Sequence, residues 1–244
     1  FTEILNLLAD IGAMYGVRLA VEPLQVSETN FVNTYAEGYA LAKKLISHNH
    51  RVIVATSSLK AQPDHEIDAD GIEIFRLPAI PFMNGRLPLL RPCPEFFRLA
   101  KQLWEIPIDF CVINTYFYPL SMYAASQIHK RHIPALILNH GSAWLMTGNK
   151  ILEFAGQIYE RISASLCYHY CKNFYGVSSA AENWLKTFHI PALGTITNAI
   201  DPESVIQLAN PEIDWRRKLA LPQDAKIIAF VGRMIPEKGV SQMI

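Results

Sequence analysis

Three short segments of this sequence carry polar residues where a chain could bind an anion or exchange a proton. Asn139, His140, Gly141 and Ser142 directly follow the apolar run PALIL. A histidine can donate or accept a hydrogen bond near neutral pH, and a glycine lets a ligand approach the backbone closely. The alternative is a plain turn in which the histidine only caps the next segment, and these four residues alone do not decide between the two.

The other two segments lie nearer the C-terminal end. TNAID, which contains Asn198, ends an apolar run, although Asn and Asp are also common in simple turns. In FVGRMIPEKG, Gly232, Arg233 and Lys238 occupy a turn between an apolar strand and the start of a helix. Two cations beside the free N–H groups of a helix N-terminus suit a diphosphate better than a carboxylate. Basic residues are also common on surface loops, so this pattern is weak by itself.

The composition excludes several classes of protein. Of the 244 residues, 50% are hydrophobic and 18% are charged, so the chain can bury a sizeable core and is not intrinsically disordered. Its 22 basic and 22 acidic residues give a formal net charge of zero, which removes the electrostatic case for nucleic acid as a partner. No apolar run approaches the roughly 20 residues that span a bilayer. The four cysteines lack CxxC spacing, and we expect them to be reduced thiols of a cytoplasmic protein.

Alternating strands and helices predict how the polar segments are positioned. Amphipathic helices such as EFFRLAKQLW and KILEFAGQIYERISASLCYHYCK separate short runs rich in β-forming residues. The runs are residues 51–56, 72–76, 108–113, 134–139, 173–177 and 193–197. This alternation is typical of an α/β protein with helices on both faces of a parallel sheet, and we predict one largely parallel sheet. Such sheets bind ligands at the carboxyl ends of their strands, which is where PALIL leads into His140.

In this order, the segments resemble the family 4 glycosyltransferases of GT-B fold over residues 40–244. ALAKKLISHNHRVIVATS resembles the first helix and second strand of that family, with HNH in place of the usual (R/K)-G-H turn. ILNHGS resembles the histidine loop that faces the cleft. IYERISASLCYHYCKNFYGVSSAAENWL resembles the long helix and the D-x-V-x-x-V-S strand, with Asn173 in place of Asp. ITNAID matches N-G-I-D with Ala199 for Gly, and FVGRMIPEKG matches the G-R-(x)4-K-G loop that opens the second domain.

The resemblance implies a retaining enzyme that transfers a sugar from a nucleotide diphosphate donor to a glycan or lipid-linked acceptor in cell-surface polysaccharide synthesis. His140 would lie beside the reacting sugar, and Gly141 and Ser142 would line the acceptor cleft. The donor would be bound by Asn198, Gly232, Arg233 and Lys238. No metal and no other cofactor are expected, because the cations and helix dipoles would stabilise the diphosphate charge. The enzyme would be cytoplasmic, with peripheral association at the inner face of the membrane left open.

Proline and asparagine residues that interrupt the periodicity predict a domain boundary near residues 200–222. The boundary after residue 38 is placed where the resemblance to the family 4 glycosyltransferases begins. We expect residues 1–38 to form a helix–strand segment of a different type and residues 39–205 to form the acceptor domain of the glycosyltransferase. Residues 206–244 would be a linker and the truncated start of a second, Rossmann-like, donor-binding domain. The acidic E-(x)7-E segment, which holds the donor sugar in the family, does not follow in this sequence. We therefore expect no detectable glycosyl transfer by these residues alone.

The first 38 residues resemble a different family. EILNLLADIGAMYGVRLAVEPL is similar to a helix and strand of the xylose-isomerase-like sugar phosphate isomerases and epimerases, which are TIM barrels. Glu22 matches their strand-end glutamate, which binds a divalent metal. A barrel needs about 250 residues, so Glu22 cannot form a metal site alone. An isomerase fragment and a non-enzymatic remnant stay open as alternatives. We also predict that a strand at 17–22 takes the place of the family's usual first strand, in the centre of the sheet.

Overall fold

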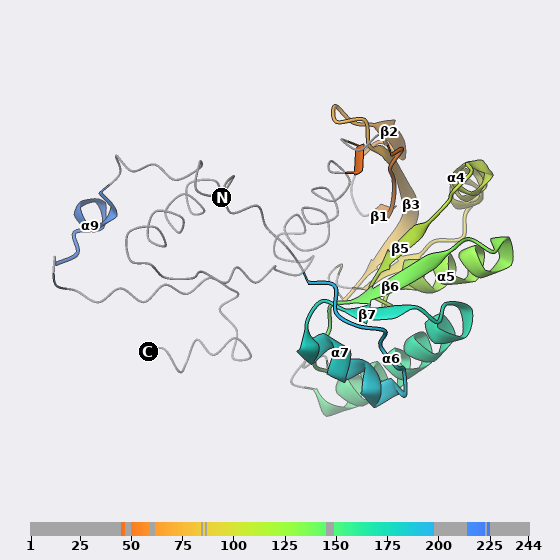
Figure 1. Cartoon of the computed structure of the whole chain (residues 1–244). Helices are drawn as coiled ribbons and strands as arrows, with labels where there is room; N and C mark the ends of the chain where they lie inside the picture. The colour runs from red at the N-terminus through yellow and green to blue at the C-terminus, as the bar shows by residue number, and fades with distance from the viewer. Residues whose placement is uncertain are drawn as a thin grey trace. The chain divides into compact units, whose positions relative to one another are not determined.

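The computed structural model describes residues 45–46, 50–58, 62–83, 85, 87–144, 149–197, 214–222 and 224. The chain divides into two compact units, of which one is Gln25–Asn198 and the other combines Phe1–Leu24 with Ala199–Ile244. The first unit contains the strands and helices of the sheet region, which Figure 1 shows in colour. In the second unit the structure describes the short helix α9 (Trp215–Lys218). The domain boundaries predicted after residues 38 and 205 stay predictions.

The first sheet is built around β1 (Ile53–Ser58) and β3 (Glu73–Phe82), which run parallel. β2 (His65–Ile67) pairs antiparallel with the first half of β3, and β4 (Leu87–Leu90) pairs antiparallel with its second half. β2 and β4 were not predicted, because runs of three and four residues are too short to show a period. The parallel pair itself agrees with the predicted strands.

The second sheet consists of three parallel strands in the order β5 (Cys111–Asn114), β6 (Ala135–Asn139) and β7 (Phe174–Gly176). Each of the three was predicted from its apolar run. At 193–197 the prediction of a strand is wrong, because the structure has only an isolated bridge between Thr195 and Gly176 there.

The prediction of one continuous sheet is also wrong for the described residues, which form two separate sheets. β1 is one edge strand of the first sheet, and β5 is one edge strand of the second. The N–H of Glu73 donates to the backbone oxygen of Val52, so the even-numbered residues of β1 form its backbone hydrogen bonds with β3. The backbone N–H and C=O groups of Ile53, Ala55 and Ser57 therefore face the open edge of the sheet. The N–H of Cys111 donates to Pro134, which leaves Val112 and Asn114 on the open edge of β5. Within the described part of the chain, no strand lies against either edge.

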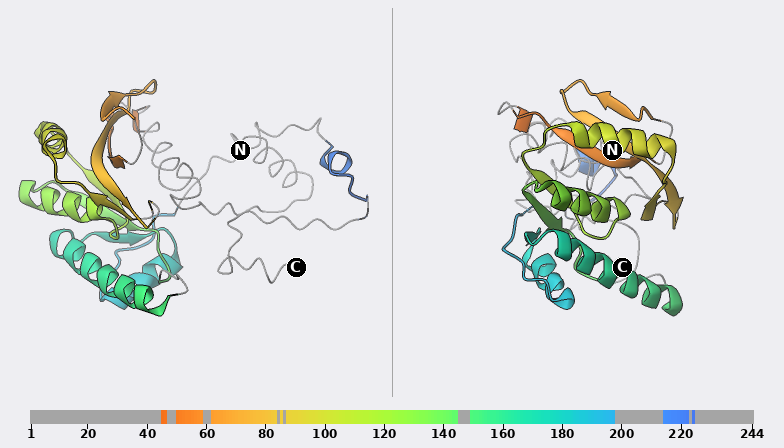
Figure 2. Two further views of the ribbon diagram at one scale, coloured as in Figure 1. Left: turned by 180° about the vertical axis from the view of Figure 1, so that it is seen from behind. Right: turned by 90° about the vertical axis from the view of Figure 1, so that its right-hand side faces the viewer.

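Three helices form a layer over one face of both sheets: α4 (Pro94–Glu105), α5 (Pro119–Arg131) and α6 (Lys150–Tyr170) (Figure 2). Both α4 and α5 carry proline in the first turn, where its missing N–H breaks no helical bond. α4 packs on the first sheet through the cluster Phe75, Leu77, Phe96, Leu99 and Leu103. α5 and α6 pack on the second sheet through Ile113, Ala125, Ile128, Ile137, Ala164 and Cys167.

The two sheets are connected through side chains of this helical layer. Trp104 at the end of α4 packs against both clusters, and its Nε1 donates to Tyr123 Oη of α5 at 3.2 Å. On the opposite face, Ile46 packs against Ile72 and Ile74. Residues from helical segments therefore cover both faces of the first sheet, and the predicted class, an α/β protein with a Rossmann-like parallel sheet, is confirmed.

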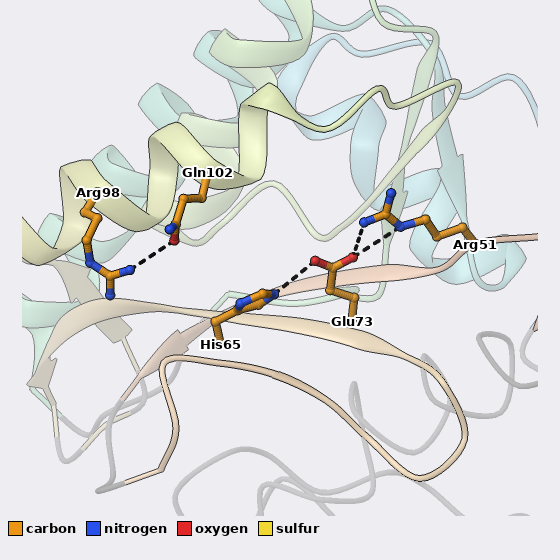
Figure 3. Close-up of polar contacts among 5 residues, drawn as sticks. All are labelled: Arg51, His65, Glu73, Arg98 and Gln102. Carbon is orange, nitrogen blue, oxygen red and sulfur yellow. Dashed lines mark hydrogen bonds and ion pairs between the residues drawn. The ribbon is translucent and has the colours of Figure 1, made fainter.

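A buried carboxylate holds the amino ends of the first sheet together (Figure 3). Glu73 accepts from Arg51 Nη2 at 2.6 Å, and its other oxygen lies 3.0 Å from His65 Nε2. His65 also stacks on Phe75, with ring centroids 4.2 Å apart. Burial alone would raise the pKa of Glu73, but the hydrogen bonds and charges of Arg51 and His65 outweigh it and lower that pKa. The carboxylate therefore ties β3 to β2 and to Arg51, two residues before β1.

Glu73→Gln should lower the free energy of unfolding near neutral pH by about 1 kcal/mol and flatten its dependence on acid pH. A carboxyl with a depressed pKa contributes stability above its unfolded pKa, which is about 4.5, and loses it as the pH falls through the folded pKa. Urea unfolding near neutral pH and at roughly pH 3 measures both effects. Arg98 also lowers the pKa of Glu95, but this pair is exposed and solvent screens it, so Glu95→Gln is the control and should change little. Equal pH dependence in the two variants would contradict the role of Glu73.

The strand predicted at 17–22 lies outside the described residues, and its place between β1 and β5 stays a prediction. If it pairs there, the amides of Ile53, Ala55, Val112 and Asn114 are hydrogen-bonded and exchange slowly with solvent. Leu19→Pro should then speed their exchange at least about tenfold, because proline cannot continue a central strand, whereas Leu19→Val should not. Amide exchange followed by NMR measures this. Fast exchange of these amides in the unsubstituted chain would rule the pairing out.

Candidate functional site

The candidate site lies at the carboxyl ends of β5 and β6. The two strands run side by side, with Asn114 opposite Leu138, so the residues that follow them emerge at the same edge. His140 Nε2 lies 3.4 Å from Asn114 Oδ1. The structure therefore brings the predicted histidine, which is half-buried, against an asparagine from the neighbouring strand.

The loop after β6 takes its shape from the side chain of Asn139, which is fully buried. Its Oδ1 accepts from Gly141 N at 3.1 Å, and its Nδ2 donates to Gly141 O and to Ala181 O, both at 2.9 Å. Its own backbone oxygen accepts from Val177 N at 3.0 Å. Asn139 is therefore a structural residue, and it fixes the backbone on both sides of His140.

Burial lowers the pKa of His140 below its ordinary value, so the imidazole is neutral near pH 7. An amide oxygen can only accept, so the contact with Asn114 requires the proton on Nε2. This tautomer leaves a lone pair on Nδ1. Nδ1 has no hydrogen-bond partner among the described residues. A neutral imidazole held in this way can accept a hydrogen bond from a ligand hydroxyl.

Gly141 and Ser142 continue the loop on the exposed side of His140. A Cβ added at Gly141 would meet only ordinary contacts, the nearest being Asn139 Oδ1 at 3.6 Å. The packing therefore does not require a glycine here, and an alanine could be built without displacing a neighbour. Because Gly141 has no side chain, the space beside His140 stays open.

Sequence reasoning missed one residue of this site and one residue that lies behind it. Asn114 ends an apolar strand, as Asn139 does, and applying the same rule to IDFCVINT would have identified it. Glu160 is buried within α6 and accepts hydrogen bonds from Tyr116 and Trp184. A single glutamate in an amphipathic helix gives no sequence signal for burial.

The other predicted site residues are not placed by the structure. Asn198, Gly232, Arg233 and Lys238 lie outside the described residues, and so does Glu22 of the isomerase alternative. Their roles stay predictions. Among the described residues there is no group of three or more His, Cys, Asp or Glu side chains that could hold a metal ion. None of the described helices combines the length and the apolar character needed to cross a membrane.

A close contact with the following helix supports the carboxyl end of β7, the third strand at this edge of the sheet. A Cβ added at Gly176, the last residue of β7, would lie 2.5 Å from Glu182 N in α7 (Ser179–Leu185). That distance is too short for any side chain, and the atom met belongs to the backbone. Only glycine therefore lets α7 pack this closely, and α7 carries the Ala181 oxygen that holds Asn139.

Gly176→Ala should destabilise the chain by about 2 to 4 kcal/mol, because the backbone of α7 would have to move. Gly156→Ala is a matched control, since a Cβ at this helical position meets nothing within 4 Å. Alanine there should raise stability by about 0.5 to 1 kcal/mol. Thermal and urea unfolding of the two variants measures both values. Equal stability of the two would show that the contact at Gly176 is not as close as described.

Comparison with known proteins connects this site to a family. A family model described as Glycosyltransferase Family 4 matches residues 38–204, which is more than half of the chain. No curated protein matches the chain. The matched span includes both sheets, the His140 loop and the Asn114 that faces it. The resemblance stated from the motifs is thereby confirmed over residues 38–204, and the chain belongs to glycosyltransferase family 4.

Proposed function

We propose that this chain provides the acceptor domain of a retaining enzyme that transfers a sugar from a nucleotide diphosphate donor to a glycan or lipid-linked acceptor. Cell-surface polysaccharide synthesis is the proposed context. The observation that supports the proposal best is the neutral, half-buried imidazole of His140 at the carboxyl edge of β6, inside the span that matches family 4. Retention and the pathway rest on the family resemblance.

A neutral histidine suits this chemistry for an electrostatic reason. Positive charge develops on the sugar ring as a glycosidic bond breaks, and an adjacent imidazolium would oppose it. Burial favours the neutral form of His140. The lone pair on Nδ1 can accept a hydrogen bond from a sugar hydroxyl and so orient the ring. Activity should therefore fall as the pH drops through the lowered pKa of His140.

The acceptor would approach over Gly141 and Ser142, where the backbone is open and the serine is exposed. The donor diphosphate would be neutralised by Arg233 and Lys238, with Gly232 and Asn198 beside it, and no metal would be needed. The isomerase alternative does not apply to residues 38–204, which match another family. A metal-binding role for Glu22 has no support from the described residues.

The proposal is tested with a chimera that carries residues 38–244 of this chain. The first strand and the remainder of the second domain come from an active family 4 glycosyltransferase. Transfer from radiolabelled nucleotide sugars should be detected, and His140→Ala should lower kcat roughly 100-fold. Lys238→Ala should also lower turnover strongly, because a cation is lost from the diphosphate. His129→Ala, which changes an exposed histidine at the end of α5, should not.

Two results would contradict the proposal. Full activity of the chimera with both substitutions would show that neither residue has the proposed role. Inversion of the anomeric configuration in the product, determined by NMR, would show that the mechanism is not retaining.

A further inference from the structure

A buried carboxyl lies behind the candidate site, outside the residues that the proposed function uses. Glu160, in the middle of α6, is 7% exposed. Its Oε1 accepts from Tyr116 Oη at 2.8 Å and from Trp184 Nε1 at 3.4 Å. Tyr116 is also buried, and its ring packs edge-on against Phe188, with centroids 5.5 Å apart. One oxygen atom therefore joins side chains from three segments of the fold.

Both donors belong to segments that carry the site. Tyr116 follows two residues after Asn114, the partner of His140, and the chain turns sharply between them at Thr115, where φ is +58°. The indole Nε1 of Trp184 lies 3.9 Å from the position of a Cβ at Gly141, directly after His140. Glu160 thus holds a neighbour of each member of the Asn114–His140 pair.

The aromatic contacts of Trp184 extend this support along the loop. Trp144, four residues after His140, packs edge-on against Trp184 with centroids 4.9 Å apart. The guanidinium of Arg161 lies 5.2 Å from the centre of the Trp144 ring. A change in the indole orientation of Trp184 would therefore alter the packing at Gly141 and at Trp144, which lie on the two sides of Ser142.

We propose that Glu160 is a positioning residue that sets the orientation of His140 against Asn114 by fixing Tyr116 and Trp184. The proposal rests on the proposed function only where it connects the orientation of His140 to catalysis, because that orientation can be measured without turnover. Glu160 acts through its two donors.

The protonation state of Glu160 makes this role testable. Burial raises the pKa of its carboxyl, against smaller opposing effects of the hydrogen bonds from Tyr116 and Trp184 and of the charge on Arg161. A raised pKa means that the stability contributed by the neutral acid is present below the unfolded pKa and is lost as the pH rises through the folded pKa. Glutamine resembles the neutral acid, because its Oε1 accepts from the same two donors. Alanine accepts from neither.

The experiment follows two NMR signals in the 244-residue chain: the imidazole titration of His140 and the indole N–H of Trp184. In Glu160→Gln the His140 titration and the exchange rate of the indole N–H should match those of the unsubstituted chain, because glutamine accepts from the same two donors. In Glu160→Ala the pKa of His140 should move back toward its ordinary value of 6.5, because a displaced Trp184 admits water to the loop. The indole N–H should exchange with solvent roughly tenfold faster.

Two further variants separate positioning from general stability. Ser163→Ala removes a buried hydrogen bond to Tyr159 in the same helix and should leave both signals unchanged. Trp184→Phe keeps Glu160 and Tyr116 but removes the second donor, and it should shift the His140 titration as Glu160→Ala does. If Glu160→Ala fails to fold, the His140 titration in Trp184→Phe decides the proposal.

The proposal is overturned if the His140 titration is the same in Trp184→Phe, or in a folded Glu160→Ala variant, as in the unsubstituted chain. It is also overturned if Glu160→Gln disturbs both signals as much as Glu160→Ala does, because the hydrogen bonds would then not be what matters. A chimera whose activity survives His140→Ala would refute the proposed function and leave these NMR results as they stand.

Discussion

The candidate site depends on one buried amide, the side chain of Asn139. Its three hydrogen bonds satisfy the backbone of Gly141 and connect the end of β6 to α7. A buried amide with an unsatisfied group would cost free energy, so the loop can adopt few other conformations without that cost. This constraint explains why His140 leaves the sheet at one angle and meets Asn114. The position of the histidine therefore follows from a neighbour whose side chain is bonded to the backbone.

Hydrophobic packing supplies the rest of the framework. The helices α4, α5 and α6 bury two clusters against the two sheets, and Trp104 takes part in both. The buried polar residues among the described part of the chain are few, and each is hydrogen-bonded: Glu73, Arg76, Ser121, Asn139, Glu160 and Ser163. Asn173 donates to Ala135 O at 2.9 Å, at the position where the family usually has aspartate. The departure from the family motif is thus accommodated by a structural hydrogen bond at the opposite end of the sheet from His140.

The sequence predicted the class of fold and the place of the histidine loop, because both depend on local patterns. An apolar run followed by Asn-His-Gly shows where a buried strand ends, and the order of the runs indicates parallel pairing. The separation into two sheets could not be predicted, since it depends on which strands become neighbours. Glu160 could not be predicted either. Its burial results from the packing of α6 against Tyr116 and Trp184, which lie 44 and 24 residues away in sequence.

The absence of a ladder between β1 and β5 in the described residues has a consequence for how this unit comes apart. Backbone hydrogen bonds make neighbouring strands open together, whereas side-chain contacts such as those of Trp104 can separate one at a time. If no other strand joins β1 to β5, the β1–β4 half, with α4, is a cooperative unit distinct from the half formed by β5, β6 and β7. His140, Asn114 and Glu160 all belong to the second half. Partial melting of the first half would then leave the candidate site assembled.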